Sequence, residues 1–367
     1  MSFKNVSVDQ FKQIYILICF FILSVVGLRS IEKGPHKRAA RIIEKFIDTY
    51  DIPGLSITVG KNGQIAWTKG FGLANINEKI PVTSKTRFRI GSISKTVTSA
   101  AVGRLVDQDK LDLDAPIQTY VPTFPEKRWP ITTRMAMSHL SGIRHYKGNE
   151  FLNEKYYSTV LKGLRIFQDD TLSHEPGTHY LYSSYAWNLV SAVVEGATGI
   201  DYLSYMEDTV FTALDTETLI AEHQDSILIP IASFYNAENG ELILAPQVNN
   251  SYKWASGGLV GTSTDLVNFI HNLHATDFLS KEVIKELHTP NTTRIGQPTN
   301  YGLGWRHYRD FWRNPFIGHS GGSVGGSAML IYYPQKEIVV AILVNSRSEK
   351  GGDLNLLAQR IARRFIH

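Results

Sequence analysis

The sequence predicts an α/β fold of the α+β kind, in which an antiparallel β-sheet flanked by helices is built from both chain ends and carries an inserted all-helical subdomain. β-rich runs lie near both ends of the chain, at residues 55–60, 65–69, 327–333 and 338–344. In the sequence between these runs, apolar residues recur mostly with the periodicity of helices. Strands from both ends share one sheet when the intervening chain leaves the sheet and returns to it.

This organisation divides the 367 residues into three parts. We expect an N-terminal targeting or membrane-anchor segment at 1–33 and one catalytic domain at 34–367. Within that domain, residues 34–105 and 290–367 form the α/β part and residues 106–289 the mainly helical part.

The first part is defined by an almost uninterrupted apolar run at residues 14–28. Fifteen residues match the core of a signal peptide, roughly 7–15 residues, and fall short of the roughly 20 that span a bilayer. A cleaved signal and a short retained anchor both remain open, and so does membrane contact through 14–28. The single cysteine, Cys19, lies in this run, so the folded domain is expected to hold no thiol.

The elements of the domain follow from local signals. Apolar residues from Ala39 to Tyr50 recur at helical spacing and stop before Pro53. Asn62-Gly63 between the first two β-rich runs is a strong hairpin signal. Further helices are expected at 185–198 and at 353–365, the second closing the chain.

Composition excludes several classes of function. A net charge of +4 is too small for a nucleic-acid footprint, so no nucleic-acid partner is expected. One thiol builds neither an intrachain disulfide nor a Cys-rich zinc site. The twelve histidines form no H-E-x-x-H pattern, and His139 and His145 are expected to be surface or structural residues. We therefore expect no metal and no cofactor, and chemistry at an oxygen nucleophile.

The first candidate for that chemistry is Ser92 with Lys95. The sequence after Gly91 has a helical pattern of apolar residues. This places Ser92 at the N-cap or in the first turn of a helix, and Lys95 on the same side of that helix. A serine hydroxyl needs a neighbouring base, and a dry cleft at a helix N-terminus lowers the pKa of a lysine towards that use. A solvent-facing lysine beside a serine cap is the alternative reading.

A second candidate is the pair Tyr182 and Ser184, which are two residues apart on an extended segment and so face the same way. A tyrosine aimed into a cleft can pass a proton to a leaving group. The alternative is a core tyrosine whose hydroxyl bonds to the backbone.

The third candidate is the glycine-rich stretch 318–326, placed directly before the run 327–333. Glycines there indicate close approach to the backbone, and His319 and Ser320 would point to opposite faces. The stretch also matches the G-x-S-x-G nucleophile elbow with Ser320 as nucleophile. That reading is disfavoured because a β-rich run, not a helix, follows it.

The order of the three motifs resembles the serine β-lactamase and penicillin-binding-protein superfamily, specifically its class C-like branch with esterases and peptidases. The resemblance covers the chain from about Arg38 to its C-terminus. It includes the sequence motifs SGIRHY at 141–146, GGLV at 257–260 and YGLGW at 301–305. Within the superfamily, the chain resembles a mitochondrial β-lactamase-like branch of animal proteins.

The resemblance implies roles for individual positions. Ser92 matches the acylated nucleophile, Lys95 its activating base and Tyr182 the second acid/base. Ser184 stands where many relatives carry asparagine, and His319 stands where β-lactamases carry lysine; both would contact substrate. Backbone N–H groups of Ser92 and Gly322 would form the oxyanion hole, with Gly321 counted beside them among the substrate and oxyanion residues.

The implied function is a serine hydrolase that forms an acyl-enzyme with a peptide or small acyl substrate, with an amide or peptide bond as first choice and an ester as a further option. The alternative is a catalytically weak or inactive scaffold that self-assembles as a homo-oligomer. The resemblance points to the mitochondrial intermembrane space, whereas the run 14–28 alone points to secretion or a membrane anchor.

Overall fold

A computed structural model describes residues 34–216, 218–222, 230–348 and 350–366. The predicted N-terminal segment, with Cys19 and the apolar run 14–28, lies outside the described residues. Among the residues that are described, no helix is both long and apolar enough to cross a membrane.

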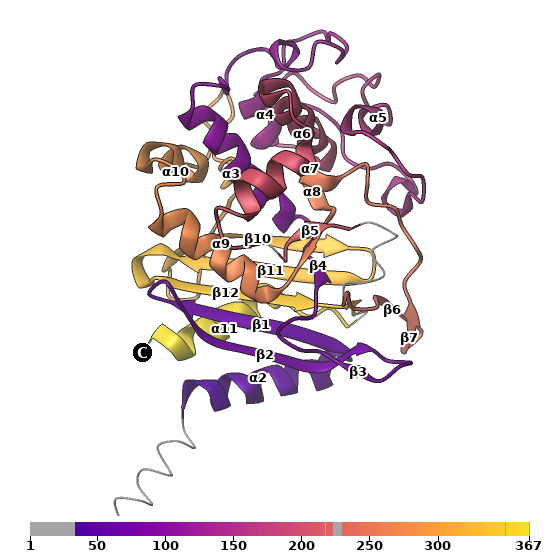
Figure 1. The fold of residues 1–367 in the computed structure, drawn as a ribbon, viewed down its shortest axis with the longest axis vertical. Helices are drawn as coiled ribbons and strands as arrows, with labels where there is room; N and C mark the ends of the chain where they lie inside the picture. The colour runs from indigo at the N-terminus through magenta and orange to yellow at the C-terminus, as the bar shows by residue number, and fades with distance from the viewer. Residues whose placement is uncertain (1–33, 217, 223–229, 349, 367) are drawn as a thin grey trace, which may run out of the picture.

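A seven-stranded sheet forms the base of the molecule, and the chain ends build it as predicted (Figure 1). Its neighbouring strands are antiparallel, and β1 pairs with β12 in the register Leu55 to Val344. Across the sheet the order is β3 (Ile80–Pro81), β2 (Gln64–Asn75), β1 (Gly54–Lys61), β12 (Ile338–Val344), β11 (Gly326–Tyr333), β10 (Pro315–Ser323) and β9 (Arg306–Arg309).

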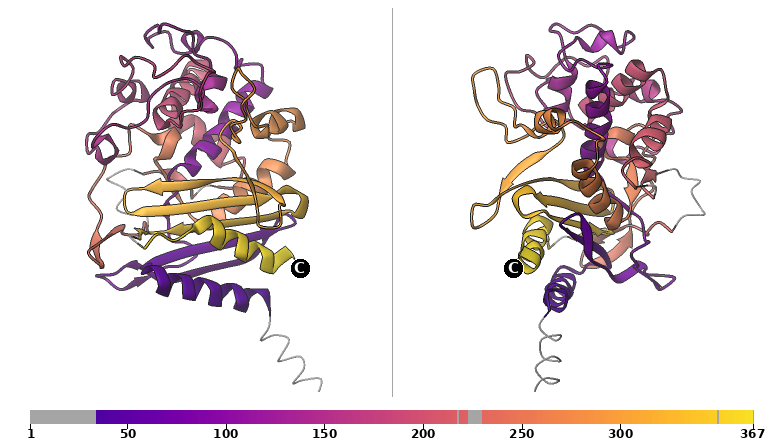
Figure 2. Two further views of the ribbon diagram at one scale, coloured as in Figure 1. Left: turned by 180° about the vertical axis from the view of Figure 1, so that it is seen from behind. Right: turned by 60° about the vertical axis from the view of Figure 1, so that its left-hand side comes forward.

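Both faces of the central strands are covered, which explains their nearly continuous apolar sequence. On one face, α2 (Pro35–Tyr50) and α11 (Leu354–Ile366) pack side by side beneath the sheet (Figure 2). On the other face lies α9 (Ser263–Ala275), which sequence reasoning had assigned to the mainly helical part. Each large aliphatic side chain buried in these layers contributes about 1.5–3 kcal/mol.

Glycines decide two local features of the sheet. Asn62 and Gly63 have φ values of 52° and 73°, as the predicted Asn-Gly hairpin requires. The glycine-rich stretch expected before the run 327–333 is itself a strand, β10. Close approach at this stretch is confirmed, because a Cβ on Gly321 would lie 2.1 Å from the carbonyl oxygen of Ile90.

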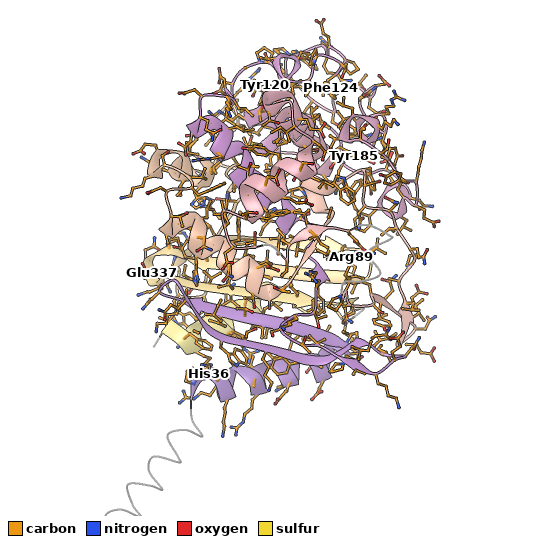
Figure 3. The ribbon with its side chains drawn as sticks, in the orientation of Figure 1. His36, Arg89, Tyr120, Phe124, Tyr185 and Glu337 are labelled. Carbon is orange, nitrogen blue, oxygen red and sulfur yellow. The ribbon has the colours of Figure 1, made fainter. Side chains whose placement is uncertain are left out.

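Most of the remaining elements stand above the sheet, with Tyr120 and Phe124 at the far end of this layer (Figure 3). Its helices are α3 (Ile93–Asp107), α4 (Thr133–Met137), α5 (Val160–Leu164), α6 (Ser184–Thr198), α7 (Tyr202–Tyr205), a π-helical turn (Met206–Phe211), α8 (Trp254–Gly257) and α10 (Lys281–His288). Short strands accompany them: β4 (Phe88–Arg89), β5 (Ile220–Ala221), β6 (Tyr235–Glu238), β7 (Glu241–Leu244), β8 (Leu259–Gly261) and β13 (Ser346–Arg347). Of these, β6 and β7 lie beside one end of the sheet (Figure 1).

Helix α3 connects the two layers. It packs against α6, α8 and α10 and also against β10 and β11 of the sheet. Twelve of its fifteen residues are buried, so it is surrounded by protein on nearly all sides rather than on one face. The N-terminus of α3 therefore opens where the sheet meets the helical layer.

Candidate active site

Ser92 occupies the N-cap position of α3, as the sequence predicts. Its hydroxyl makes no capping hydrogen bond, so the oxygen remains available for other contacts. Gly91 before it has a φ of 52°, and a Cβ there would lie 2.8 Å from the backbone nitrogen of Gly322. This close approach brings the first turn of α3 against β10 and places Ser92 beside Gly322.

Lys95 is completely buried, and its amine has three neighbours among the described residues. Nζ lies 2.6 Å from the carbonyl oxygen of Ser256, 3.2 Å from Ser184 Oγ and 3.0 Å from Ser92 Oγ. A neutral amine has two N–H donors and one lone pair. Donation to Ser256 and Ser184 leaves the lone pair for the Ser92 hydroxyl.

The electrostatics favour that neutral amine. Burial lowers the pKa of Lys95 well below its usual value, and the positive charges of Arg306 and Lys253 lower it further. No carboxylate contacts the amine among the described residues, since its three partners are two hydroxyls and a carbonyl. The solvent-facing lysine considered from the sequence is therefore wrong.

Tyr182 and Ser184 are brought to the same place, as predicted. Ser183 caps α6 by accepting from the Ala186 N–H, and Ser184 begins the helix. The ring of Tyr182 has its centroid 5.1 Å from Lys95 Nζ, and its hydroxyl hydrogen-bonds to Ser92. Burial raises the pKa of Tyr182, while that hydrogen bond and Arg306 act in the opposite direction. The phenol therefore keeps its proton at neutral pH.

Two histidines hold the backbone that carries this pair. Nδ1 of His139 accepts from the Ser183 N–H at 3.1 Å, and Nδ1 of His145 accepts from the Ser184 N–H at 3.2 Å. Burial lowers the pKa of both rings, to about 4 for His145, which keeps Nδ1 available as an acceptor. A structural role was expected for both from the sequence, but His145 also lines the cavity beside Ser92.

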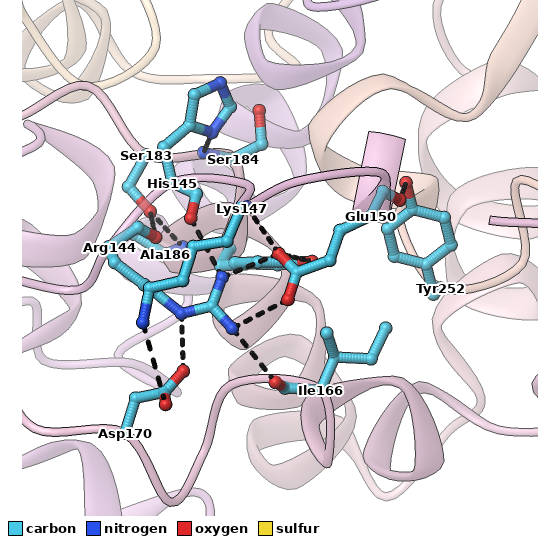
Figure 4. Close-up of polar contacts among 11 residues, drawn as sticks. Arg144, His145, Lys147, Glu150, Ile166, Asp170, Ser183, Ser184, Ala186 and Tyr252 are labelled. Carbon is cyan, nitrogen blue, oxygen red and sulfur yellow. Dashed lines mark hydrogen bonds and ion pairs between the residues drawn. The ribbon is translucent and has the colours of Figure 1, made fainter. Parts of the chain in front are cut away.

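Arg144 fixes the segment that carries His145 (Figure 4). Its guanidinium donates to both carboxylate oxygens of Glu150, at 2.7 and 2.9 Å, and also pairs with Asp170. The Arg144 carbonyl accepts from the Ser183 hydroxyl at 2.7 Å. The Glu150 and Asp170 side chains are 26% and 37% exposed, so each ion pair alone is screened by solvent, and the support for the site comes from the several hydrogen bonds that the Arg144 guanidinium makes together.

His319 lies near Tyr182, with ring centroids 6.3 Å apart, and is buried in β10, whereas Ser320 is exposed. Its Nδ1 donates to the Ser320 carbonyl at 2.6 Å, and its Nε2 accepts from the Tyr301 hydroxyl at 2.9 Å. Burial, with Arg306 and Lys95, lowers the pKa of this imidazole well below its usual value, so it is neutral. Ser320 lies within strand β10, and another strand follows it. A nucleophile elbow requires a turn from a strand into a helix, so Ser320 is not in one.

Arg306 is a site residue that sequence reasoning missed. Its guanidinium carbon lies 5.1 Å from the Tyr182 ring centroid and 5.5 Å from that of Tyr301. Arg306 directly follows the YGLGW motif at 301–305, and its position after that motif was the signal in the sequence that could have identified it as a site residue.

A cavity of about 290 Å³ opens at Ser92. The backbone N–H of Ser92 has no acceptor among the described residues, and Gly322 lies on the same wall, whereas Gly321 is packed against Ile90. Lining residues that the sequence did not single out as site residues are His145, Tyr146, Phe151, Lys253, Ser256, Gly257 and Arg347.

The family model described as Beta-lactamase matches residues 39–363. The human serine beta-lactamase-like protein LACTB, mitochondrial, is 29% identical, over 88% of this chain and 78% of that protein. A D-aminopeptidase of Gluconobacter oxydans is 26% identical, over 81% of this chain and 56% of that protein.

Solved structures give the same fold. The octameric penicillin-binding protein homologue from Pyrococcus abyssi superimposes with a TM-score of 0.78 at 24% identity, covering 89% of this chain and 77% of that one. EstCE1, described as a hydrolase with promiscuous acyltransferase activity, has a TM-score of 0.77 at 20% identity, covering 92% of this chain and all of that one.

Proposed function

Because the chain belongs to the beta-lactamase family, we propose that it is a serine hydrolase that forms an acyl-enzyme at Ser92. The observation that supports this most directly is the buried amine of Lys95. Its Nζ lies within hydrogen-bond distance of the Ser256 carbonyl, of Ser184 Oγ and of Ser92 Oγ, the last at 3.0 Å, so the neutral amine proposed here donates to Ser256 and Ser184 and turns its lone pair to the Ser92 hydroxyl. A lysine held in this way is a base rather than a surface cation.

In the proposed reaction, the Ser92 hydroxyl gives its proton to Lys95 as its oxygen attacks the substrate carbonyl. The N–H groups of Ser92 and Gly322 receive the developing oxyanion. When the tetrahedral intermediate collapses, the carbonyl–leaving-group bond breaks, Tyr182 gives its proton to the leaving group, and the proton held by Lys95 passes to Tyr182, which restores the phenol and the neutral amine. Water then attacks the Ser92 ester, which releases the acid and restores the serine hydroxyl.

An amide or peptide bond is the proposed substrate bond, and an ester is the next choice. The family includes penicillin-binding proteins and a D-aminopeptidase. Ser184, which lines the cavity, contacts substrate in this proposal, whereas His319, for which the sequence predicts the same role, is buried beneath the cavity-lining residues with both ring nitrogens bonded. Neutral His319, bonded to Tyr301, does not supply the ammonium that a lysine would place there, and this disfavours penicillin as the natural substrate.

Labelling with a fluorophosphonate probe tests the nucleophile. The wild-type protein is expected to label, and Ser92→Ala is expected to abolish labelling. Ser320→Ala is the matched control, since Ser320 is exposed on β10 and should have no effect. Undiminished labelling of Ser92→Ala would refute the assignment.

The alternative function is an inactive scaffold that self-assembles. The Pyrococcus abyssi protein is described as octameric, but the likeness to it concerns the fold alone. The intact contacts of Ser92, Lys95 and Tyr182 favour the enzyme. Failure of the wild-type protein to label, together with a large assembly in sedimentation, would favour the scaffold.

We also propose that the protein is mitochondrial, because its LACTB relatives from human, cow and mouse are named as mitochondrial proteins, and that it lies in the intermembrane space, as the sequence resemblance implies. Protease protection of isolated mitochondria measures this. The protein should resist protease until the outer membrane is ruptured, and sensitivity before rupture would contradict the placement.

A further inference from the structure

Arg306 is a cation of the site to which the proposed reaction gives no step. It is the first residue of β9, where it pairs with Gly318 of β10, the neighbour of His319. Its guanidinium carbon lies 5.1 Å from the centroid of the Tyr182 ring and 5.5 Å from that of Tyr301. A cation at this distance from an aromatic ring is attracted by the ring. The strand pairing therefore holds a positive charge against Tyr182.

No carboxylate pairs with this charge within residues 34–216, 218–222, 230–348 and 350–366. None of the ion pairs in these ranges includes Arg306, and its Nε is enclosed without a hydrogen-bond partner. Arginine does not lose its proton in proteins, so the charge is permanent. Partial burial of a cation without an anionic partner costs free energy, which packing alone does not explain.

Arg306 stands behind Tyr182 as seen from the cavity. The described residues that line the cavity include Ser92 and Tyr182 but not Arg306. The geometry therefore does not support substrate binding by the guanidinium. It places the charge instead over the ring of Tyr182, whose hydroxyl hydrogen-bonds to Ser92.

The other titratable groups around Tyr182, apart from Lys95, do not supply a charge. They are three histidines and three tyrosines: His139, His145, His319, Tyr146, Tyr180 and Tyr301. Burial lowers the pKa of each of these histidines and raises the pKa of each of these tyrosines, so all six are uncharged at neutral pH. Among the described residues, Arg306 is therefore the permanent charge beside this ring.

The proposed reaction gives Tyr182 a negative charge for part of each cycle. Its proton moves to the leaving-group atom as the carbonyl–leaving-group bond breaks, and the proton held by Lys95 then restores the phenol. Burial disfavours the phenolate and so raises the pKa of Tyr182, whereas the positive charge of Arg306 favours the phenolate. A fixed charge that stabilises this state lowers the barrier for departure of a basic leaving group.

Resting on the proposed function, we propose that Arg306 is a positioning residue that acts through Tyr182. Its guanidinium, held over the ring by β9, stabilises the negative charge that develops on the phenol oxygen as the leaving group takes the proton. Arg306 itself forms and breaks no bond in this step. Its effect should be large for an amide, whose leaving amine must be protonated, and small for an ester whose leaving group departs as a stable anion.

The same charge predicts a shift in the pH profile. Arg306 and Lys253 both lower the pKa of Lys95, and catalysis needs the neutral amine. Without Arg306 the pKa of Lys95 rises, so activity on the acid side should be lost at a higher pH. The further titratable groups that face Lys95 are Tyr182, His139, His145 and His319.

The test uses two substrates with the same acyl group, hexanoyl 4-nitroanilide and 4-nitrophenyl hexanoate. In the full chain at the pH of maximal activity, Arg306→Met is expected to lower kcat/KM by roughly 10-fold for the anilide and by about threefold or less for the ester. The acid limb of the ester profile should also move to higher pH, which loss of a purely structural contact would not cause. Arg306→Lys keeps a cation and should recover most of the loss.

A double-mutant cycle tests whether Arg306 acts through Tyr182. In a Tyr182→Phe background, Arg306→Met should cause no further loss with the anilide, because the hydroxyl on which the charge acts is absent. Arg306→Gln also removes the charge and should reproduce the effects of Arg306→Met. Arg309→Met is the matched control, since Arg309 is exposed on the same strand and donates to the Arg313 carbonyl, and both rates should stay at wild-type values.

Three results overturn the inference. They are equal losses for the anilide and the ester, an acid limb that does not move, and the same loss with and without the Tyr182 hydroxyl. Hydrolysis of neither substrate by the wild type would instead overturn the proposed function on which the inference rests.

Discussion

Lys95→Met is expected to lower kcat/KM for ester hydrolysis by about 1,000-fold, within the range that a positioned acid or base provides. Methionine has a similar length and can occupy the buried position, but it has no lone pair of sufficient basicity to take the Ser92 proton. Hydrolysis of 4-nitrophenyl hexanoate and the rate of fluorophosphonate labelling both measure the loss.

Two controls separate catalysis from folding. Lys61→Met removes a lysine on β1 that donates to the Phe365 carbonyl, far in sequence from the site, and should leave kcat/KM unchanged. A thermal melt of Lys95→Met should remain cooperative. If Lys95→Met kept more than a tenth of the wild-type kcat/KM, another group would have to be the base.

The pH profile of the wild type reports on the same amine. Catalysis needs neutral Lys95, whose pKa is lowered by burial, so activity should be lost as pH falls through that lowered pKa rather than near 10.4, the ordinary lysine value. The proton of Tyr182 is retained because its pKa is raised. A profile that still rises steeply between pH 9 and 10 would mean that Lys95 is charged at neutral pH.

Much of the fold could be predicted because its signals are local. The hairpin at Asn62-Gly63 and the apolar strands of both chain ends carry their own periodicity, and the sheet follows from pairing them. Strand β10 could not be predicted, because Gly318, Gly321 and Gly322 lower β-propensity. At Gly318 and Gly321 a side chain is excluded, because neighbouring backbone comes within about 2 Å of where a Cβ would lie. This crowding arises from tertiary packing, which the local sequence does not reveal.

The residues of the candidate site likewise fall into those that the sequence predicts and those that only the folded structure reveals. Ser92, Lys95, Tyr182 and His319 fall in short motifs whose order identified the family. Lys253 does not fall in such a motif, because a lysine beside aromatic residues is common in protein sequences and predicts no particular role. What distinguishes it is burial among rings from two segments about a hundred residues apart, and that becomes visible only after folding.

Tyr182→Phe is the second large effect, and it depends on the leaving group. The variant removes only the hydroxyl and keeps the ring packed against Lys95 and Arg306. For an anilide, whose leaving group must be protonated, we expect kcat/KM to fall by about 100- to 1,000-fold. For the matching 4-nitrophenyl ester, whose leaving group departs as a stable anion, the loss should be about tenfold or smaller.

The comparison distinguishes an acid from a support. If Tyr182 acted only by orienting Ser92, both substrates would lose activity equally, since attack by the serine precedes departure of either group. Tyr180→Phe is the matched control, because Tyr180 lies on the same segment but its ring packs against those of His139, at 5.7 Å, and Tyr301, at 6.1 Å, rather than against Ser92. It should leave both rates near wild type. An equal loss for anilide and ester in Tyr182→Phe would refute its role as the proton donor, because a proton donor matters in proportion to the basicity of the group that leaves.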